Sequence, residues 1–175
     1  DSNLRNSTMV GIVGAGGGKA LDTARAVAAA LNLPVVCCPT VAASDAPCSA
    51  LSVVYTPAGV FDRCLFYKRN PDLVLVDTSI IARAPARFLI AGMGDALATW
   101  FEADTAHRAC KRNQVGGGST LAAMAIARTC YQTLLQDGTA AVAAARAGAV
   151  TPALERIIEA NTLLSAMTDN QMHLR

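Results

Sequence analysis

The sequence lacks long apolar runs, clusters of basic residues and paired cysteine motifs. Apolar stretches such as Leu73–Val76 and Phe88–Ala91 fall far short of the roughly 20 residues that cross a bilayer, and no signal-peptide pattern is present. The 15 Lys and Arg residues are scattered and the formal net charge is +2, which argues against nucleic acid as a partner. Six cysteines in 175 residues are too few for a disulfide scaffold, and none forms a CxxC pair, so reduced thiols are expected. We therefore expect a cytoplasmic protein that binds neither membrane nor nucleic acid.

Short strand-like runs alternate with turn residues in the first half of the chain. Because 53% of the residues are hydrophobic and 16% are charged, a packed core is expected, in one domain or two small ones. A helical pattern over Gly18–Leu31 separates the first two runs, which predicts a βαβ unit with a parallel sheet. Pro57 and Gly59 predict an antiparallel hairpin attached to that sheet. The expected strands are Met9–Val13, Val35–Pro39, Leu51–Tyr55, Phe61–Tyr67 and Leu73–Asp77.

Helical spacing dominates after about residue 84. Pro85 and Pro152 suit first-turn positions, and Thr151 suits a helix N-cap. The sequence thus predicts a parallel-sheet α/β part over residues 1–84, followed by an all-helical part over residues 85–175. The expected helices are Pro85–Ala91, Met93–Arg108, Ser119–Gln136, Thr139–Ala147 and Thr151–Ala166, with a break at Gly116–Gly118.

A glycine-rich turn joins the first expected strand to the first helix. Gly16, Gly17 and Gly18 have no Cβ, so a phosphate can approach the backbone where the helix begins, next to Lys19. A dinucleotide pyrophosphate would fit there. The turn matches neither the GxGxxG fingerprint nor the Walker motif, which argues against an ATPase, and a tight turn without a ligand is the alternative. Asp22 is either a charge near the start of the helix or a group that orients the ligand.

A polar loop follows the second expected strand and leaves the same edge of the sheet. Ligands of open α/β sheets bind beyond the carboxyl ends of the strands, so the loop side chains are expected to face a crevice shared with the glycine turn. Ordinary turn chemistry is the alternative, since Asp and Ser are common before Pro. The loop residues concerned are Thr40, Ser44, Asp45 and Ser49.

One helical segment presents acidic groups at helical spacing. Asp95 is expected in the first turn of its helix, and Thr99 and Glu102 share its face. An acidic residue in a first turn is also favourable simply because of the helix dipole. His107 and His173 form no paired-ligand spacing, so neither is expected to bind a metal.

Several motifs together resemble the glycerol dehydrogenase family of the iron-containing (metal-dependent, group III) alcohol dehydrogenase superfamily. They are Gly16-Gly-Gly-Lys19 with Asp22-Thr-Ala24, Asp45-Ala-Pro-Cys-Ser-Ala-Leu-Ser52, Asn70-Pro-Asp-Leu-Val-Leu-Val-Asp77, Gly92-Met-Gly-Asp-Ala-Leu-Ala-Thr-Trp-Phe-Glu102, Val150-Thr-Pro-Ala-Leu-Glu155 and Glu159-Ala-Asn-Thr-Leu-Leu-Ser165. The resemblance implies a dehydroquinate synthase-like fold, in which an NAD-binding α/β part (residues 1–84) precedes a helical metal-binding part (85–175).

The resemblance also implies roles for individual residues. The implied reaction is NAD-dependent oxidation of glycerol, or a similar small polyol, to dihydroxyacetone, with a divalent metal, usually zinc, polarising the substrate oxygen. Asp45 would bind the polyol and Asp95 would be a metal ligand. The implied NAD contacts are Gly16, Gly17, Gly18, Lys19, Asp22, Thr40, Ser49, Leu51 and Tyr55. Full-length members of the family form homo-oligomers.

The sequence departs from the family at both ends. The two histidine ligands that the family places downstream of Ser165, and the several further strands with which family members begin, are absent from these 175 residues. One carboxylate does not hold a zinc ion tightly, so we expect this chain alone to carry no stoichiometric metal and to be inactive. The alternatives are a non-enzymatic remnant that retains nucleotide binding and a related glycerol-phosphate or hydroxy-acid dehydrogenase; the unbroken stretch Asp45–Ser52 favours glycerol over the latter.

Overall fold

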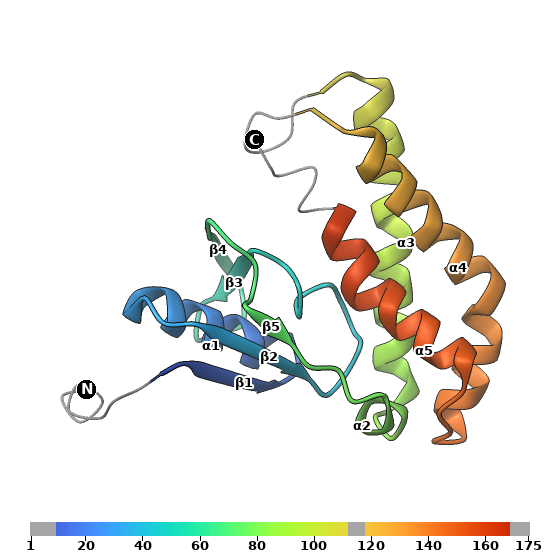
Figure 1. The fold of residues 1–175 in the computed structure, drawn as a ribbon, viewed down its shortest axis with the longest axis horizontal. Helices are drawn as coiled ribbons and strands as arrows, with labels where there is room; N and C mark the ends of the chain where they lie inside the picture. The colour runs from blue at the N-terminus through green and yellow to red at the C-terminus, as the bar shows by residue number, and fades with distance from the viewer. Residues whose placement is uncertain (1–9, 112–117, 169–175) are drawn as a thin grey trace.

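A small parallel sheet lies beside a group of long helices in the computed structural model, which describes residues 10–111 and 118–168 (Figure 1). The sheet has three strands in the order β1-β2-β5, and a separate two-stranded sheet is formed by β3 and β4. In chain order the elements are β1 (Ile12–Gly16), α1 (Gly18–Leu31), β2 (Val35–Pro39), β3 (Leu51–Tyr55), β4 (Phe61–Phe66), β5 (Leu73–Val74), α2 (Thr78–Ala82), α3 (Ala86–Arg108), α4 (Leu121–Arg146), α5 (Pro152–Glu159) and the π-helix η2 (Ala160–Leu164).

The expected βαβ unit is confirmed. Strands β1 and β2 are parallel, in register from Ile12↔Val35 to Gly16↔Pro39. Helix α1 packs closely on β1, because a Cβ added to Gly14 would lie 2.5 Å from the Cβ of Ala24. The first strand was expected at Met9–Val13 but runs over Ile12–Gly16, since its glycines pair with β2 as regular strand residues.

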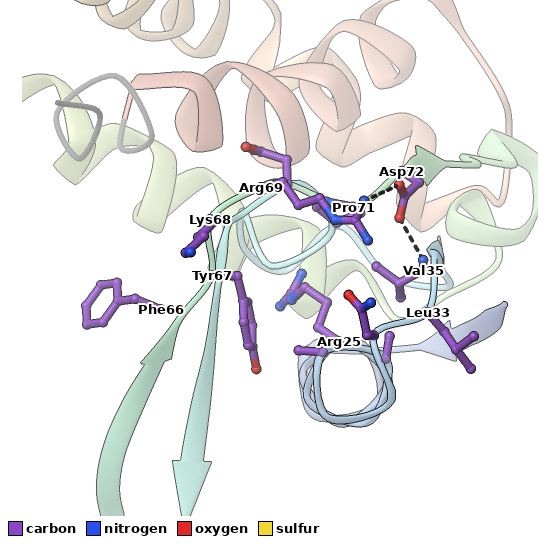
Figure 2. A pocket seen from close by; sticks show the side chains of 13 residues that line it. Arg25, Leu33, Val35, Phe66, Tyr67, Lys68, Arg69, Pro71 and Asp72 are labelled. Atoms are coloured by element: carbon purple, nitrogen blue, oxygen red, sulfur yellow. Dashed lines mark hydrogen bonds and ion pairs between the residues drawn. The ribbon is translucent and has the colours of Figure 1, made fainter. Parts of the chain in front are cut away.

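The connection from β5 to α2 differs from the expected long strand. Strand β5 is limited to Leu73–Val74, and Asp77 caps the unexpected helix α2 by accepting hydrogen bonds from the N–H groups of Ser79 and Ile80. At the start of β5, the Asp72 carboxylate accepts a hydrogen bond of 2.8 Å from the Val35 N–H (Figure 2). A carboxylate that satisfies the N–H groups of a following turn favours a helix over a continued strand.

The antiparallel hairpin is confirmed, but its attachment to the parallel sheet is wrong. Strands β3 and β4 pair from Leu51↔Phe66 to Tyr55↔Phe61 and form their own sheet. The hairpin is held against α1 instead, where the Ser52 hydroxyl donates a hydrogen bond of 2.9 Å to the Asp22 carbonyl.

Two of the long helices continue through positions where breaks were expected. Helix α3 passes through Gly92 and α4 passes through Asp137-Gly138. Tertiary packing explains both glycines: the space beside Gly92 is filled by Ala42 and Asn161, and that beside Gly138 by Met93. The expected helix Thr151–Ala166 is present with Thr151 as its N-cap, but its second half winds as the π-helix η2. The break at Gly116–Gly118 falls largely outside the described residues.

Two groups of buried side chains form the core. The smaller one joins α1 to β1 and β2 and includes Leu21, Ala24 and Val35. The larger one fills the space between α3, α4 and α5, and it also takes in Ala42 and Ile81 from the first half of the chain. A division near residue 84 stays a prediction. In the described part of the chain, no helix is both long and apolar enough to cross a membrane.

Candidate functional site

The glycine turn connects β1 to α1 as expected. Gly16 has φ +146°, a conformation that side chains other than glycine rarely adopt, and Gly17 is the N-cap without a side-chain hydrogen bond. The loop after β2 lies directly against the turn. The Thr40 N–H donates 3.0 Å to the Gly16 carbonyl, and a Cβ on Gly18 would lie 3.6 Å from the Cβ of Ala46. The two loops are thus in contact, as expected, whereas a crevice shared by them stays a prediction.

A groove of about 560 Å³ runs between α1 and the β3–β4 hairpin. Three of the expected nucleotide contacts line it: Lys19, Asp22 and Tyr55. The Lys19 Nζ lies 5.3 Å from the centre of the Tyr55 ring, within cation–π distance. An exposed cation and an aromatic ring beside a helix N-terminus suit a ligand that carries both phosphate and a planar ring.

The other expected nucleotide contacts do not line this groove. Ser49 is buried, whereas Thr40 and Leu51 are half-buried. They lie along the loop after β2 and at the start of β3, and none of them lines the groove. Their contact with a nucleotide stays a prediction.

Asp45 and Asp95 meet where the α/β part faces helix α3. The Asp95 carboxylate accepts a hydrogen bond from the backbone N–H of Asp45, and Glu102, expected on the same helix face, is close enough to act on Asp95. Asp95 was expected in the first turn of its helix. It lies instead in the middle of the continuous α3, so its position does not depend on the helix dipole.

Both carboxyl groups are perturbed by their surroundings. Burial, together with the nearby Asp95 charge, raises the pKa of Asp45 to about 6. Burial also raises the pKa of Asp95, although the Asp45 N–H opposes the rise. Asp45 is half-buried and Asp95 is exposed, so the larger effect falls on Asp45, and a carboxyl whose pKa is raised beside a second acidic group is typical of functional sites.

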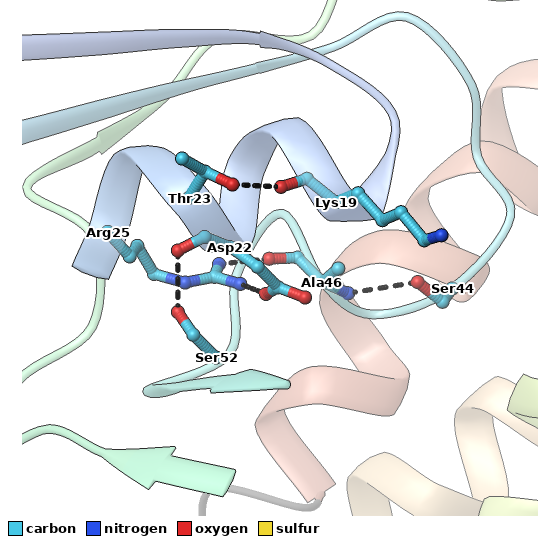
Figure 3. A network of polar contacts seen from close by, with 7 residues as sticks. All are labelled: Lys19, Asp22, Thr23, Arg25, Ser44, Ala46 and Ser52. Atoms are coloured by element: carbon cyan, nitrogen blue, oxygen red, sulfur yellow. Dashed lines mark hydrogen bonds and ion pairs between the residues drawn. The ribbon is translucent and has the colours of Figure 1, made fainter. Parts of the chain in front are cut away.

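Arg25 is a site residue that the sequence reasoning missed. Its side chain is 3% exposed and donates hydrogen bonds to the Asp22 carboxylate and to the Ala46 carbonyl, next to Asp45 (Figure 3). It therefore ties helix α1 to the loop that carries Asp45. An arginine between Leu21 and Ala28 on the apolar face of a helix was the signal that could have found it.

Asn161 was also missed. It is fully buried in η2, and its Nδ2 donates 3.0 Å to the Ala42 carbonyl and 3.1 Å to the Leu89 carbonyl. Gly92 makes this approach possible, because a Cβ there would lie 2.1 Å from the Ala42 carbonyl oxygen. These contacts fix the distance between the Asp45 loop and the helix that carries Asp95. An asparagine within an apolar helical run was the available signal.

The metal-ligand prediction rests on Asp95 alone. Across residues 10–111 and 118–168, no group of three or more His, Cys, Asp and Glu side chains is arranged to hold a metal ion. The His107 Nδ1 lies 2.8 Å from the Ser119 hydroxyl on the surface, and His173 lies outside the described residues. Because catalytic zinc takes about three protein ligands, these residues fit only part of such a site.

The matching family model and two similar curated proteins are described as dehydrogenases or reductases. Residues 2–78 match the family model described as iron-containing alcohol dehydrogenase. A glycerol dehydrogenase of Thermotoga maritima is 60% identical over 156 residues, which are 89% of this chain and 43% of that protein. A glycolaldehyde reductase of Halobacterium salinarum is 49% identical over the same share of both chains. This chain thus spans less than half the length of the curated relatives that it matches.

The comparison with solved structures agrees. The crystal structure of glycerol dehydrogenase from Schizosaccharomyces pombe superposes with a TM-score of 0.88 at 45% identity, over 92% of this chain and 41% of that one. The expected fold class, an α/β part with a parallel sheet followed by helices in a dehydroquinate synthase-like fold, is thereby confirmed.

Proposed function

The chain belongs to the iron-containing alcohol dehydrogenase family, a family of oxidoreductases, and from this premise we propose that it contributes to NAD-dependent oxidation of glycerol or a similar small polyol. The observation that carries the proposal is the contact between Asp45 and Asp95 at the carboxyl ends of β1 and β2. It brings the two expected acidic positions together beside the glycine turn. Ligands of α/β folds bind at such an edge.

The groove between α1 and the hairpin supports the nucleotide assignment. Lys19 would offset the charge of the pyrophosphate, the glycine turn would let it approach the backbone, and Tyr55 would contact a ring. When bound there, NAD supplies the hydride acceptor. Thr40, Ser49 and Leu51 are proposed as further contacts along the same loop and strand.

Asp45 is proposed as the group that orients the polyol. A carboxyl with a pKa of about 6 is mostly ionised at pH 7, so it accepts a hydrogen bond from a substrate hydroxyl. Its placement depends on Arg25 and on the Asn161 contacts described above.

Asp95 is proposed as one ligand of a divalent metal, and zinc is the metal that we propose. The described residues supply too few donors for a complete site, so we derive no step of the reaction through the metal.

The small number of metal donors also favours a second candidate function: a protein that binds a nucleotide in the groove between α1 and the hairpin but catalyses no reaction. Assembly into a homo-oligomer and a cytoplasmic location are likewise proposals.

Nucleotide binding by the chain itself provides the first test. We expect NAD to bind saturably and Lys19→Met to weaken binding about tenfold, the order expected for loss of one charge-assisted contact. Lys111→Met is the matched control, since Lys111 is exposed, follows the C-terminal end of α3 and does not line the groove. Absence of saturable NAD binding, or equal weakening by both variants, would contradict the nucleotide site.

A chimaera tests the reaction. Here the 156 matched residues replace their counterparts in the Thermotoga maritima relative. We expect NAD-linked glycerol oxidation in the chimaera and a loss of about 100-fold or more on Asp95→Asn, with Asp104→Asn as the control on the same helix. A folded chimaera that binds NAD but oxidises no polyol would favour the second candidate.

A further inference from the structure

A second cavity is lined by Arg25, the residue that also holds the Asp45 loop. Its volume is about 430 Å³, within the range of roughly 300–1,000 Å³ that is usual for small-molecule sites. Part of helix α1 forms one wall, and the segment from the end of β4 to the start of β5 forms the other (Figure 2). None of the residues assigned to glycerol or NAD lines it.

Two buried polar atoms of this cavity lack partners. Among the described residues, neither the Arg25 Nε nor the Tyr67 hydroxyl oxygen has a hydrogen bond, although both atoms are buried. The terminal nitrogens of Arg25 are already engaged, by Asp22 and by the Ala46 carbonyl, so Nε is left with a free N–H. A buried donor without an acceptor is unfavourable, and a ligand or an ordered water that accepts its hydrogen bond removes this cost.

The charge around the cavity favours an anion. Lys68 and Arg69 stand beside Tyr67 at its rim. The single carboxylate of the lining, on Asp72, is already occupied by the Val35 N–H and lies 3.6 Å from an Arg69 nitrogen. Positive charge therefore exceeds negative charge at the rim.

Apolar side chains make up much of the remaining lining, beside two asparagines, which suits an organic molecule better than a bare ion. The apolar residues include Ala28, Leu33, Phe66 and Pro71. The walls are also fixed in place, because the Asn70 side chain donates 2.7 Å to the Cys48 carbonyl. A preformed cavity binds without a large ordering cost.

We propose that this cavity binds a small organic oxyanion, with its phosphate or carboxylate on the Arg25 Nε–H, the Tyr67 hydroxyl and Lys68, and its apolar part against α1. Arg25 would then contact the bound anion on one side and the Asp45 loop on the other. This anion site is independent of the proposed dehydrogenase activity, because none of the residues assigned to glycerol, NAD or the metal lines the cavity. Arg25, which also holds the Asp45 loop, is the residue that the two sites share.

The test is a titration of the chain followed by NMR amide shifts. The probes are phenyl phosphate, benzoate, inorganic phosphate and the neutral analogue benzyl alcohol. We expect saturable binding of at least one aromatic anion, with shifts concentrated in residues 66–72 and 28–33 and with no saturable binding of benzyl alcohol. Comparison of phenyl phosphate with benzoate identifies the preferred oxyanion, and inorganic phosphate shows what the charged group contributes alone.

Variants at the rim separate this site from nonspecific attraction. Tyr67→Phe removes only the hydroxyl and should weaken binding about fivefold, and Lys68→Gln should weaken it about threefold. Arg63→Gln, at an exposed arginine on β4 outside the cavity, is the control and should leave binding unchanged. An Arg25 variant is avoided because its loss would disturb the fold.

Three outcomes would overturn the proposal. These are no saturable binding of either aromatic anion, shifts confined to the glycine turn, and affinities that Tyr67→Phe and Lys68→Gln leave unchanged. In each of these cases the two buried donors are satisfied by water alone.

Discussion

The backbone N–H of Asp45 donates a hydrogen bond to the carboxylate of Asp95. One residue lies in a loop that follows a parallel strand, and the other lies in the middle of a long helix. The contact therefore joins the two parts of the chain at the point where the proposed substrate and metal positions meet. Five predictions concern this junction and its surroundings.

Gly92→Ala is expected to destabilise the protein by about 2 kcal/mol or more, because the new Cβ would overlap the Ala42 carbonyl, a backbone atom that moves little. Gly94→Ala is the matched control in the same helix. Nothing lies within 4 Å of a Cβ at Gly94, so the change should stabilise the helix by about 0.5–1 kcal/mol. Urea unfolding of both variants measures the difference, and equal effects would show that Gly92 is not a packing position.

Asn161→Leu should cost about 2–4 kcal/mol, because two backbone carbonyls, those of Ala42 and Leu89, would lose their buried donor. Gln132→Leu serves as the control, since Gln132 is exposed on α4. Chemical denaturation gives the free energies of unfolding. A loss below about 0.5 kcal/mol, within the range of ordinary surface changes, would remove Asn161 from the junction.

Protonation of Asp45 should make stability depend on pH. The folded-state pKa of about 6 lies above the ordinary value of 3.8, so the folded protein binds the proton more tightly than the unfolded chain does. The stabilisation that comes from the protonated Asp45 is fully present below about pH 4 and is lost as pH rises through about 6, on the order of 3 kcal/mol. Asp45→Asn should flatten this part of the stability profile and leave the rest of it in place.

The same carboxyl can be followed directly by NMR. Because the Asp95 charge raises the pKa of Asp45, Asp95→Asn should lower it, whereas Asp104→Asn, on the same helix but paired with Arg108, should not. Carbon-detected titration of the aspartate side chains measures both variants. An Asp45 pKa that does not respond to Asp95→Asn would mean that the two carboxyl groups are farther apart than described.

Alkylation of the cysteines should distinguish Cys110 from Cys48. Burial and the nearby Asp45 raise the pKa of Cys48 to about 11, which leaves little reactive thiolate at pH 8, whereas Cys110 is exposed. We expect iodoacetamide to label Cys110 on the order of tenfold faster. Mass spectrometry after partial labelling gives the order, and Cys37 and Cys130, which are buried, should react slowly as well. Faster labelling of Cys48 would indicate that its loop opens in solution.

Local sequence determined much of the fold. Periodicity alone places α1 at Gly18–Leu31, β2 at Val35–Pro39 and β3 at Leu51–Tyr55, because these segments obey their own turn and hydrophobic signals. It failed at Gly92 and at Asp137-Gly138, where glycine was expected to end a helix. Helix–helix packing outweighs a local propensity cost of about 1 kcal/mol at such positions.

Some residues of the candidate site could likewise be found from the sequence, whereas others could be found only from the tertiary structure. Lys19, Asp22, Asp45 and Asp95 could be singled out as candidates, since a glycine turn and acidic residues are visible in the sequence, but the roles of Asp45, Tyr55 and Asp95 came from the resemblance to a known family. Arg25 and Asn161 could not be assigned, because their importance lies in the carbonyl groups that they reach in distant segments. The sequence by itself therefore determined which chemical groups the protein carries and which local elements hold them. Only the tertiary structure decided that Asp45 meets Asp95 and that Arg25 lines a cavity while it also holds the loop that carries Asp45, because such contacts depend on how buried polar groups are satisfied across distant segments.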